Sequence, residues 1–183
     1  MLLVAAAKEE LGPLVGEVLG VGPVHAAVRM ATLLERHRPD RVVLIGTAGA
    51  YPGGPAIGTA VVAHRMGLSW GIAALGLGYV PRAPLPIDAD PTLLSLLTCP
   101  RHAVLTAGAI TTDPDLARRL ADDWTVEHLE AFAAALACKS AGVPFVAVLG
   151  IANGVGPDAH AEWLANRDQA QSAARAAILP VLS

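Results

Sequence analysis

The chain has 183 residues and a formal net charge of -3, and 54% of its residues are hydrophobic while 16% are charged. This length and composition suit a single domain over residues 1–183 with a sizeable core, and they argue against intrinsic disorder. The arginines are scattered and form no basic stripe, which argues against a nucleic-acid partner. Two cysteines are too few for a disulfide framework and fit a reducing cytoplasm.

The N-terminal segment is short and apolar. Residues 2–7 predict a strand buried on both faces of a parallel sheet, and they are too few for a membrane span or a signal peptide. Glu9 and Glu10 follow this strand and are expected to open a helix, which Gly12 and Pro13 keep short. A second brief strand is expected at residues 15–19.

Helix and strand patterns alternate along the next hundred residues. Apolar residues recur at helical spacing from Pro23 to Arg38, and Pro39 ends that helix. Residues 41–45, 57–64 and 102–106 are expected strands, residues 115–122 an expected helix, and residues 46–50 an expected small-residue turn. Residues 69–77 fit either a strand or a loop, and the proline-rich residues 78–91 predict a loop suited to a lid or an interface.

The last third of the chain contains the most informative stretch, residues 126–156. Glu130 stands at the start of an alanine-rich helix, and Asn153 stands where the apolar run Val143–Ile151 breaks. In open α/β sheets, ligands bind outside the carboxyl ends of the strands, so Asn153 is an expected ligand contact. A final helix is expected from about residue 158 to residue 179. The alternation predicts an α/β fold with a mainly parallel sheet.

Several common motifs of catalytic sites are absent from the sequence. It has no phosphate-binding loop, no dinucleotide fingerprint and no nucleophile turn. The six histidines never occur at metal-ligand spacing, so each is assigned a surface or structural role. We therefore expect no metal and no cofactor.

Five segments, taken in order, resemble the purine nucleoside phosphorylase and nucleosidase superfamily. They are Ala-Ala-Lys-Glu-Glu-Leu, Gly-Val-Gly-Pro-Val-His-Ala-Ala, Arg-Pro-Asp-Arg-Val-Val-Leu-Ile-Gly-Thr-Ala-Gly-Ala, Val-Glu-His-Leu-Glu-Ala and Pro-Phe-Val-Ala-Val-Leu-Gly-Ile-Ala-Asn. The resemblance implies a three-layer sandwich around a mixed, mainly parallel sheet. It also implies a homo-oligomer and a small-molecule nucleoside substrate, with no membrane partner.

The same resemblance assigns roles to two carboxylates. Glu10 would deprotonate a water molecule, and Glu130 would hold the ribose hydroxyls. Cleavage of an N-glycosidic bond develops an oxocarbenium-like sugar, so both contacts gain strength in the transition state. The other residues expected to line the substrate are Thr47, Ala48, Gly49, Thr106, Ile110 and Leu129.

Asn153 and the arginines separate the possible reactions. Nucleosidases that cleave adenine have an aspartate at the position of Asn153, and an amide instead suits a 6-oxopurine such as hypoxanthine. Phosphorylases of the superfamily have an arginine where this chain has Leu44, so hydrolysis is favoured over phosphorolysis. Arg29 or a neighbouring subunit remains a possible source of the missing charge.

The stretch Ile-Ala-Asn-Gly-Val-Gly-Pro-Asp, with Trp163 downstream, most resembles the futalosine hydrolase family. The resemblance implies release of hypoxanthine from futalosine in menaquinone biosynthesis. Only about ten residues separate the first two motifs, and Leu149 or Gly150 replaces an arginine usual in the family. Three alternatives stay open: a methylthioadenosine/adenosylhomocysteine nucleosidase, a purine nucleoside phosphorylase, and a nucleoside-binding homologue without catalysis.

Overall fold

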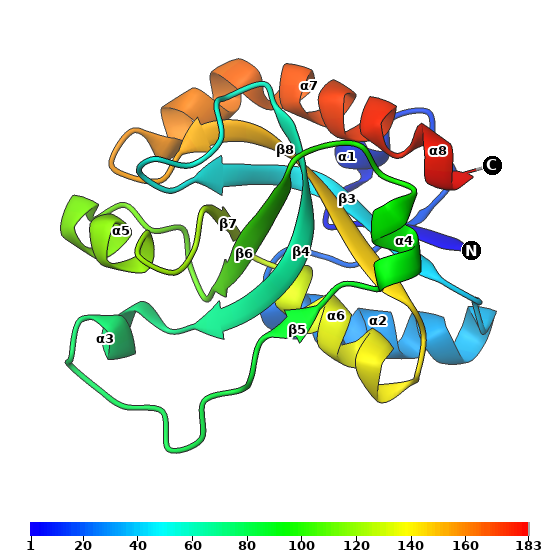
Figure 1. The fold of residues 1–183 in the computed structure, drawn as a ribbon, viewed down its shortest axis with the longest axis horizontal. Helices are drawn as coiled ribbons and strands as arrows, with labels where there is room; N and C mark the ends of the chain where they lie inside the picture. The colour runs from blue at the N-terminus through cyan, green and yellow to red at the C-terminus, as the bar shows by residue number, and fades with distance from the viewer. Residues whose placement is uncertain (183) are drawn as a thin grey trace.

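A computed structural model describes residues 1–182 (Figure 1). In chain order the elements are β1 (Leu2–Ala5), α1 (Lys8–Leu11), β2 (Glu17–Val18), α2 (Pro23–His37), β3 (Val42–Ala50), β4 (Ala60–Ser69), α3 (Gly71–Ala74), β5 (Ile87–Asp88), α4 (Pro91–Ser95), β6 (Arg101–Ala107), α5 (Pro114–Leu120), β7 (Val126–His128), α6 (Ala131–Ser140), β8 (Phe145–Gly154), α7 (Ala159–Ala177) and α8 (Leu179–Leu182). The predicted mixed α/β fold is confirmed.

The strands form one mixed sheet in which parallel pairs predominate. Strands β1 and β2 pair in parallel at one edge, β1 pairs with β3, and β5 forms the other edge by pairing antiparallel with β4. In between, β3 pairs with β8, β8 with β4, β4 with β6, β6 with β7, and β7 returns to β3. Five strands therefore close into a ring. The three-layer sandwich that the sequence resemblance implied therefore describes the molecule only in part.

Helices cover the two sides of this sheet (Figure 1). The long helix α7 lies across β8 and β3 on one side, while α2 and α6 pack against each other on the opposite side. Gly150 in β8 allows the close approach of α7, because a Cβ there would lie 1.9 Å from the backbone oxygen of Ala170. The sequence of this strand thus decides how near α7 comes to the sheet.

The strands next to the cavity described below differ from the sequence expectations at two places. Residues 46–50 continue β3 and do not form a turn, because they keep pairing with β8 across a register shift at Ala48 and Gly49. Residues 126–128 form β7 between β6 and β3, ahead of the helix that begins at Ala131. Their partners are distant in sequence, so local patterns could not reveal these strands.

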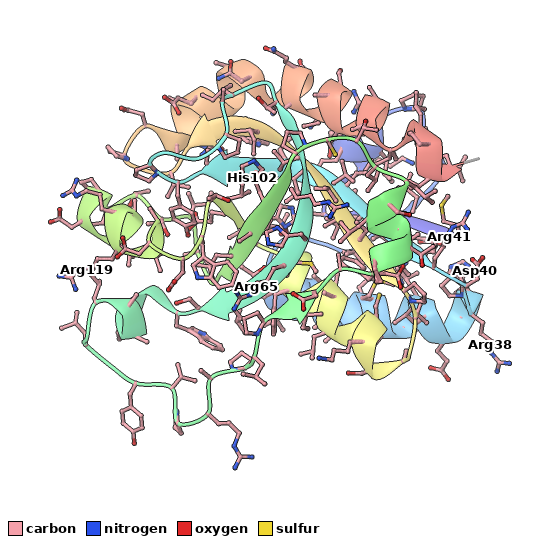
Figure 2. The ribbon with its side chains drawn as sticks, viewed as in Figure 1. Arg38, Asp40, Arg41, Arg65, His102 and Arg119 are labelled. Atoms are coloured by element: carbon pink, nitrogen blue, oxygen red, sulfur yellow. The ribbon has the colours of Figure 1, made fainter. Side chains whose placement is uncertain are left out.

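Several charged side chains lie at the periphery of the molecule (Figure 2). Figure 2 shows Arg38 and Arg119 at opposite ends of the molecule, and Asp40 near Arg38 accepts a hydrogen bond from the N-terminal amine at 2.6 Å. Within residues 1–182, no helix has both the length and the apolar character needed to cross a membrane.

Candidate active site

The carboxyl ends of several strands and one face of α7 enclose a cavity of about 650 Å³. Its walls come from segments far apart in the sequence. The lining residues are Ala6, Ala7, Glu9, Glu10, Val21, Thr47, Ala48, Gly49, Ile110, Glu127, His128, Leu129, Glu130, Asn153, Ala159, His160, Trp163, Arg167, Asp168 and Gln171. A cavity of this size suits a small organic ligand.

Glu10 is the most firmly held carboxylate of the cavity. It lies in α1 just after β1, is 8% exposed, and its two oxygens accept four hydrogen bonds. The amides of Ala6 and Ala7 donate to Oε2, each at 3.1 Å, and the amide and hydroxyl of Thr47 donate to Oε1 at 2.9 and 3.2 Å. Burial raises the pKa of Glu10, and the backbone amides of Thr47 and Ala7 oppose the rise. Glu10 is thus a buried carboxylate with a fixed orientation.

A tryptophan of α7 orients the hydroxyl that reaches Glu10. The indole Nε1–H of Trp163 donates to Thr47 Oγ1 at 3.0 Å. The Thr47 hydroxyl therefore accepts from one side and donates to the carboxylate on the other. This connection joins helix α7 to Glu10, and the spacing of these residues in the sequence gives no sign of it.

Glu130 is the second buried carboxylate and directly precedes helix α6, at its N-cap position. It is 4% exposed, and its Oε1 accepts a hydrogen bond from the Gly22 amide at 2.7 Å. Burial raises the pKa of Glu130 to about 7, against the lowering effect of that bond. The glycine turn before α2 and the start of α6, which are 108 residues apart, therefore meet at this side chain.

His128 lines the same cavity and was missed by the sequence analysis, which gave every histidine a surface or structural role. It is 4% exposed, and its Nδ1 accepts hydrogen bonds from the amides of Glu130 and Ala131 at 3.2 and 3.1 Å. Burial lowers the pKa of His128 to about 4, with the charge of Glu10 acting in the opposite direction. Its position two residues before Glu130 was the only available signal.

Asn153 pairs with Gly49 near the carboxyl end of β8. It therefore lies inside the strand, whereas the sequence predicted a position after the strand. It is 8% exposed, and its Nδ2 donates to the Gly154 carbonyl at 2.8 Å. Among the described residues, no hydrogen bond is formed by its Oδ1. Since Asn153 lines the cavity, that oxygen is an acceptor available to a ligand.

A third buried carboxylate, Glu127, holds the loop after β6. Its Oε1 accepts from the Thr111 amide at 2.9 Å, and its Oε2 accepts from the hydroxyls of Thr111 and Tyr51 at 2.6 and 2.7 Å. Burial and the charge of Glu127 raise the pKa of Tyr51, so its phenol stays protonated. These bonds fix the loop that carries Ile110, which is 53% exposed, to the cavity wall.

The structure brings most of the expected site residues together. Glu10, Thr47, Ala48, Gly49, Ile110, Leu129, Glu130 and Asn153 all line the cavity. Thr106 does not: it is fully buried, and its hydroxyl accepts a hydrogen bond from the Phe132 amide at 2.9 Å. The prediction that Thr106 contacts the purine base was therefore wrong. Its hydroxyl instead binds a backbone amide in the first turn of α6.

Helix α7 supplies the remaining wall. The Trp163 ring stacks on His160 with centroids 6.1 Å apart, and the Arg167 guanidinium lies 5.0 Å from the Trp163 centroid. Arg167 is the only arginine or lysine among the described residues that line the cavity. Arg29 lies outside it and pairs with Glu17 at 3.2 Å.

Known proteins with similar sequences include a hydrolase and several nucleosidases. The futalosine hydrolase of Thermus thermophilus is 33% identical over 79% of this chain and 71% of its own length. A 5'-methylthioadenosine/S-adenosylhomocysteine nucleosidase of a Geobacillus species is 26% identical over 90% of this chain and 78% of its own.

Solved structures show the same fold at low sequence identity. The futalosine hydrolase of Helicobacter pylori has a TM-score of 0.87 at 14% identity, covering 98% of this chain and 95% of that chain. The Neisseria meningitidis 5'-methylthioadenosine/S-adenosylhomocysteine nucleosidase in complex with methylthio-immucillin-A has a TM-score of 0.83 at 17% identity, covering 98% and 96%. Residues 11–183 match the family model of the phosphorylase superfamily, and the chain therefore belongs to that superfamily.

Proposed function

We propose that the chain is a nucleoside N-ribosyl hydrolase that releases hypoxanthine from futalosine. The coarser part of this statement, N-glycosyl hydrolysis, is supported by relatives that are named hydrolases and nucleosidases. The observation that carries the proposal is the held carboxylate of Glu10, which lines the same cavity as the carboxylate of Glu130 and the amide of Asn153.

The reaction assigns one task to each of these groups. Glu10 takes a proton from water, whose oxygen forms a bond to C1' of the ribose. The bond from C1' to the purine nitrogen breaks, and the purine leaves with the electron pair and takes up a proton from solvent. Glu130 binds ribose hydroxyls, and its ionised form stabilises the positive charge that develops on the sugar.

Asn153 is the proposed contact to the purine. Its Nδ2 is engaged by the Gly154 carbonyl, which orients the amide and leaves Oδ1 as an acceptor. A 6-oxopurine with a protonated ring nitrogen offers a matching donor to this oxygen. The 6-amino group of adenine is also a donor, so the choice between the two bases rests on the proton that adenine needs at a ring nitrogen and that an amide cannot supply. This supports hypoxanthine as the released base.

Hydrolysis is favoured over phosphorolysis by the charges around the cavity. Phosphate needs cationic donors, preferably a bidentate arginine. Leu44 is fully buried in β3, Arg29 is paired with Glu17 outside the cavity, and Arg167 stacks on Trp163. Five acidic residues line the cavity, Glu9, Glu10, Glu127, Glu130 and Asp168, and they repel an inorganic dianion.

A second candidate is hydrolysis of 5'-methylthioadenosine or S-adenosylhomocysteine. The relatives named for that activity cover up to 90% of this chain at 26–28% identity. The residue Asn153 argues against it, because an amide cannot donate a titratable proton to an adenine ring nitrogen.

The test measures the release of free base from futalosine, inosine and 5'-methylthioadenosine. The reactions are run with and without phosphate, and the products are separated by chromatography. Phosphate-independent hypoxanthine from futalosine, at a kcat/KM well above that for the other two, is the expected result. Adenine from methylthioadenosine as the main product would favour the second candidate. No base from any substrate would favour a nucleoside-binding homologue without catalysis.

The homo-oligomer implied by the sequence resemblance stays a prediction. The segment after β4 carries apolar side chains that are strongly exposed in the single chain, with Leu77 at 74%, Tyr79 at 85% and Leu85 at 82%. Such exposure is typical of surfaces that are covered by another subunit. Sedimentation velocity of the purified chain measures the assembly directly.

A further inference from the structure

We propose that His128 is a third catalytic residue, whose Nε2–H donates a hydrogen bond to the water molecule that Glu10 deprotonates. This inference rests on the proposed hydrolase function. It concerns a residue for which the sequence analysis gave only a surface or structural role.

The hydrogen bonds of Nδ1 determine where the imidazole carries its proton. Two backbone N–H groups, of Glu130 and Ala131, point at Nδ1 at 3.2 and 3.1 Å, so this nitrogen is an acceptor. A neutral imidazole then carries its single proton on Nε2. Burial, which lowers the pKa of His128 to about 4, keeps the ring neutral at physiological pH.

The carboxylates around the ring agree with this tautomer. Glu130 Oε2 lies 3.4 Å from Nδ1, but a neutral ring cannot form an ion pair there. On the other side of the ring lies Glu10, whose negative charge is attracted by a donor at Nε2.

Nε2 and Glu10 face a common space next to Gly46. A Cβ placed on Gly46 would lie 3.0 Å from His128 Nε2 and 3.2 Å from Glu10 Oε1. No direct hydrogen bond joins these two atoms, and Nε2 has no hydrogen-bond partner within residues 1–182. Because both residues line the cavity, one water molecule can bridge them.

A second anchor for the water has a chemical reason. The oxygens of Glu10 already accept four hydrogen bonds from protein groups, so a water molecule at this carboxylate shares an oxygen with those donors. A donor from His128 fixes the water through one lone pair and leaves another free to attack C1'. During the step one proton passes from water to Glu10, and His128 keeps its own proton. Orientation of this kind lowers the barrier without further charge transfer.

Two substitutions separate this role from the structural one. In His128→Asn, the amide oxygen occupies the place of Nδ1 and keeps the acceptor for the Glu130 and Ala131 amides, while the donor at Nε2 is lost. In His128→Gln, the longer amide reaches the place of Nε2 and keeps a donor, while the acceptor near the backbone is lost. The two variants therefore remove one function each.

The measurements are kcat, KM and the pH profile of free-base release, together with the thermal midpoint of each variant. We expect His128→Asn to melt near the wild type but to lose about tenfold to a hundredfold in kcat, with KM within about twofold. We expect His128→Gln to melt lower yet to keep the higher kcat. The acidic limb of the profile, which belongs to Glu10, remains in both variants.

The opposite ranking would overturn the inference. A His128→Asn variant with wild-type kcat, or losses of kcat that follow the thermal midpoints, would assign His128 a structural role alone. If the wild type releases no base from any nucleoside, the proposed function fails and this inference fails with it. Wild-type turnover with an unaffected His128→Asn variant would overturn this inference alone.

Discussion

The indole N–H of Trp163 donates to the hydroxyl oxygen of Thr47 at 3.0 Å, although 116 residues separate them. Because the Thr47 hydroxyl accepts this bond, its own proton is free to point at Glu10, which accepts it at 3.2 Å. Helix α7 thereby orients the proposed base through a single hydroxyl group. The geometry of Glu10 thus depends on the docking of the C-terminal helix.

We expect Trp163→Phe to lower kcat about threefold to thirtyfold, because the Thr47 hydroxyl then rotates freely and holds Glu10 less well. Thr47→Val, which also removes a donor to the carboxylate, should raise the pKa of Glu10 further and move the acidic limb of the kcat profile to higher pH. Trp70→Phe is the matched control, since Trp70 lies outside the cavity. An unshifted acidic limb in Thr47→Val would contradict this role for Thr47.

Glu10→Gln should abolish most turnover. The amide keeps the size of the side chain but cannot accept a proton from water, and a positioned general base contributes about a hundredfold to ten-thousandfold. Steady-state assays at saturating substrate measure the loss in kcat. Glu35→Gln on the exposed side of α2 is the control for removal of one negative charge, and equal rates in the two variants would remove Glu10 from the mechanism.

Asn153→Asp should change which base is released. A carboxyl group can donate a proton to an adenine ring nitrogen and accept from the 6-amino group, whereas the amide suits a 6-oxopurine. We expect the ratio of kcat/KM for inosine-type over adenosine-type substrates to fall about tenfold or more. Parallel release assays on both substrates provide the ratio. If both values of kcat/KM fall by the same factor, Asn153 supports the fold of the site and does not select the base.

Glu130→Gln should stabilise the protein at alkaline pH while it impairs catalysis. The pKa of Glu130 is raised to about 7 from 4.5, so the folded state binds more protons than the unfolded state between these values. The free energy of unfolding therefore falls as the pH rises through this window, and the loss is complete above about pH 7. The amide removes that loss, and we expect a gain of about 1 to 3 kcal/mol at pH 8.

Urea unfolding of the wild type and Glu130→Gln at pH 4 and pH 8 checks this prediction. The two proteins should differ little at pH 4, where the carboxyl group is protonated in both states. The neighbouring His128, with its pKa lowered to about 4, acts in the opposite direction: its contribution is present above about pH 6.5 and is lost as the pH falls through about 4. If the difference in the free energy of unfolding between the wild type and Glu130→Gln is the same at pH 4 and pH 8, the raised pKa of Glu130 is contradicted.

The sequence by itself determined the α/β class, most of the elements and most of the cavity lining. Short apolar runs, helical spacing from Pro23 and the polar residues Glu10, Glu130 and Asn153 are local signals, and each depends on the backbone around it. The resemblance to a known superfamily placed these residues in one site, and the structure brings them around one cavity.

Only the tertiary structure decided which further groups complete that site. The short strand β7 forms because β3 and β6 pair with it, and this pairing places His128 and Glu127 at the cavity. The same packing turns Thr106 towards the start of α6, and it brings Trp163 onto Thr47. Such contacts join residues more than twenty positions apart through burial and hydrogen bonding. Local periodicity in the sequence cannot predict these contacts, because the partner of each side chain depends on how the strands of the whole sheet pair.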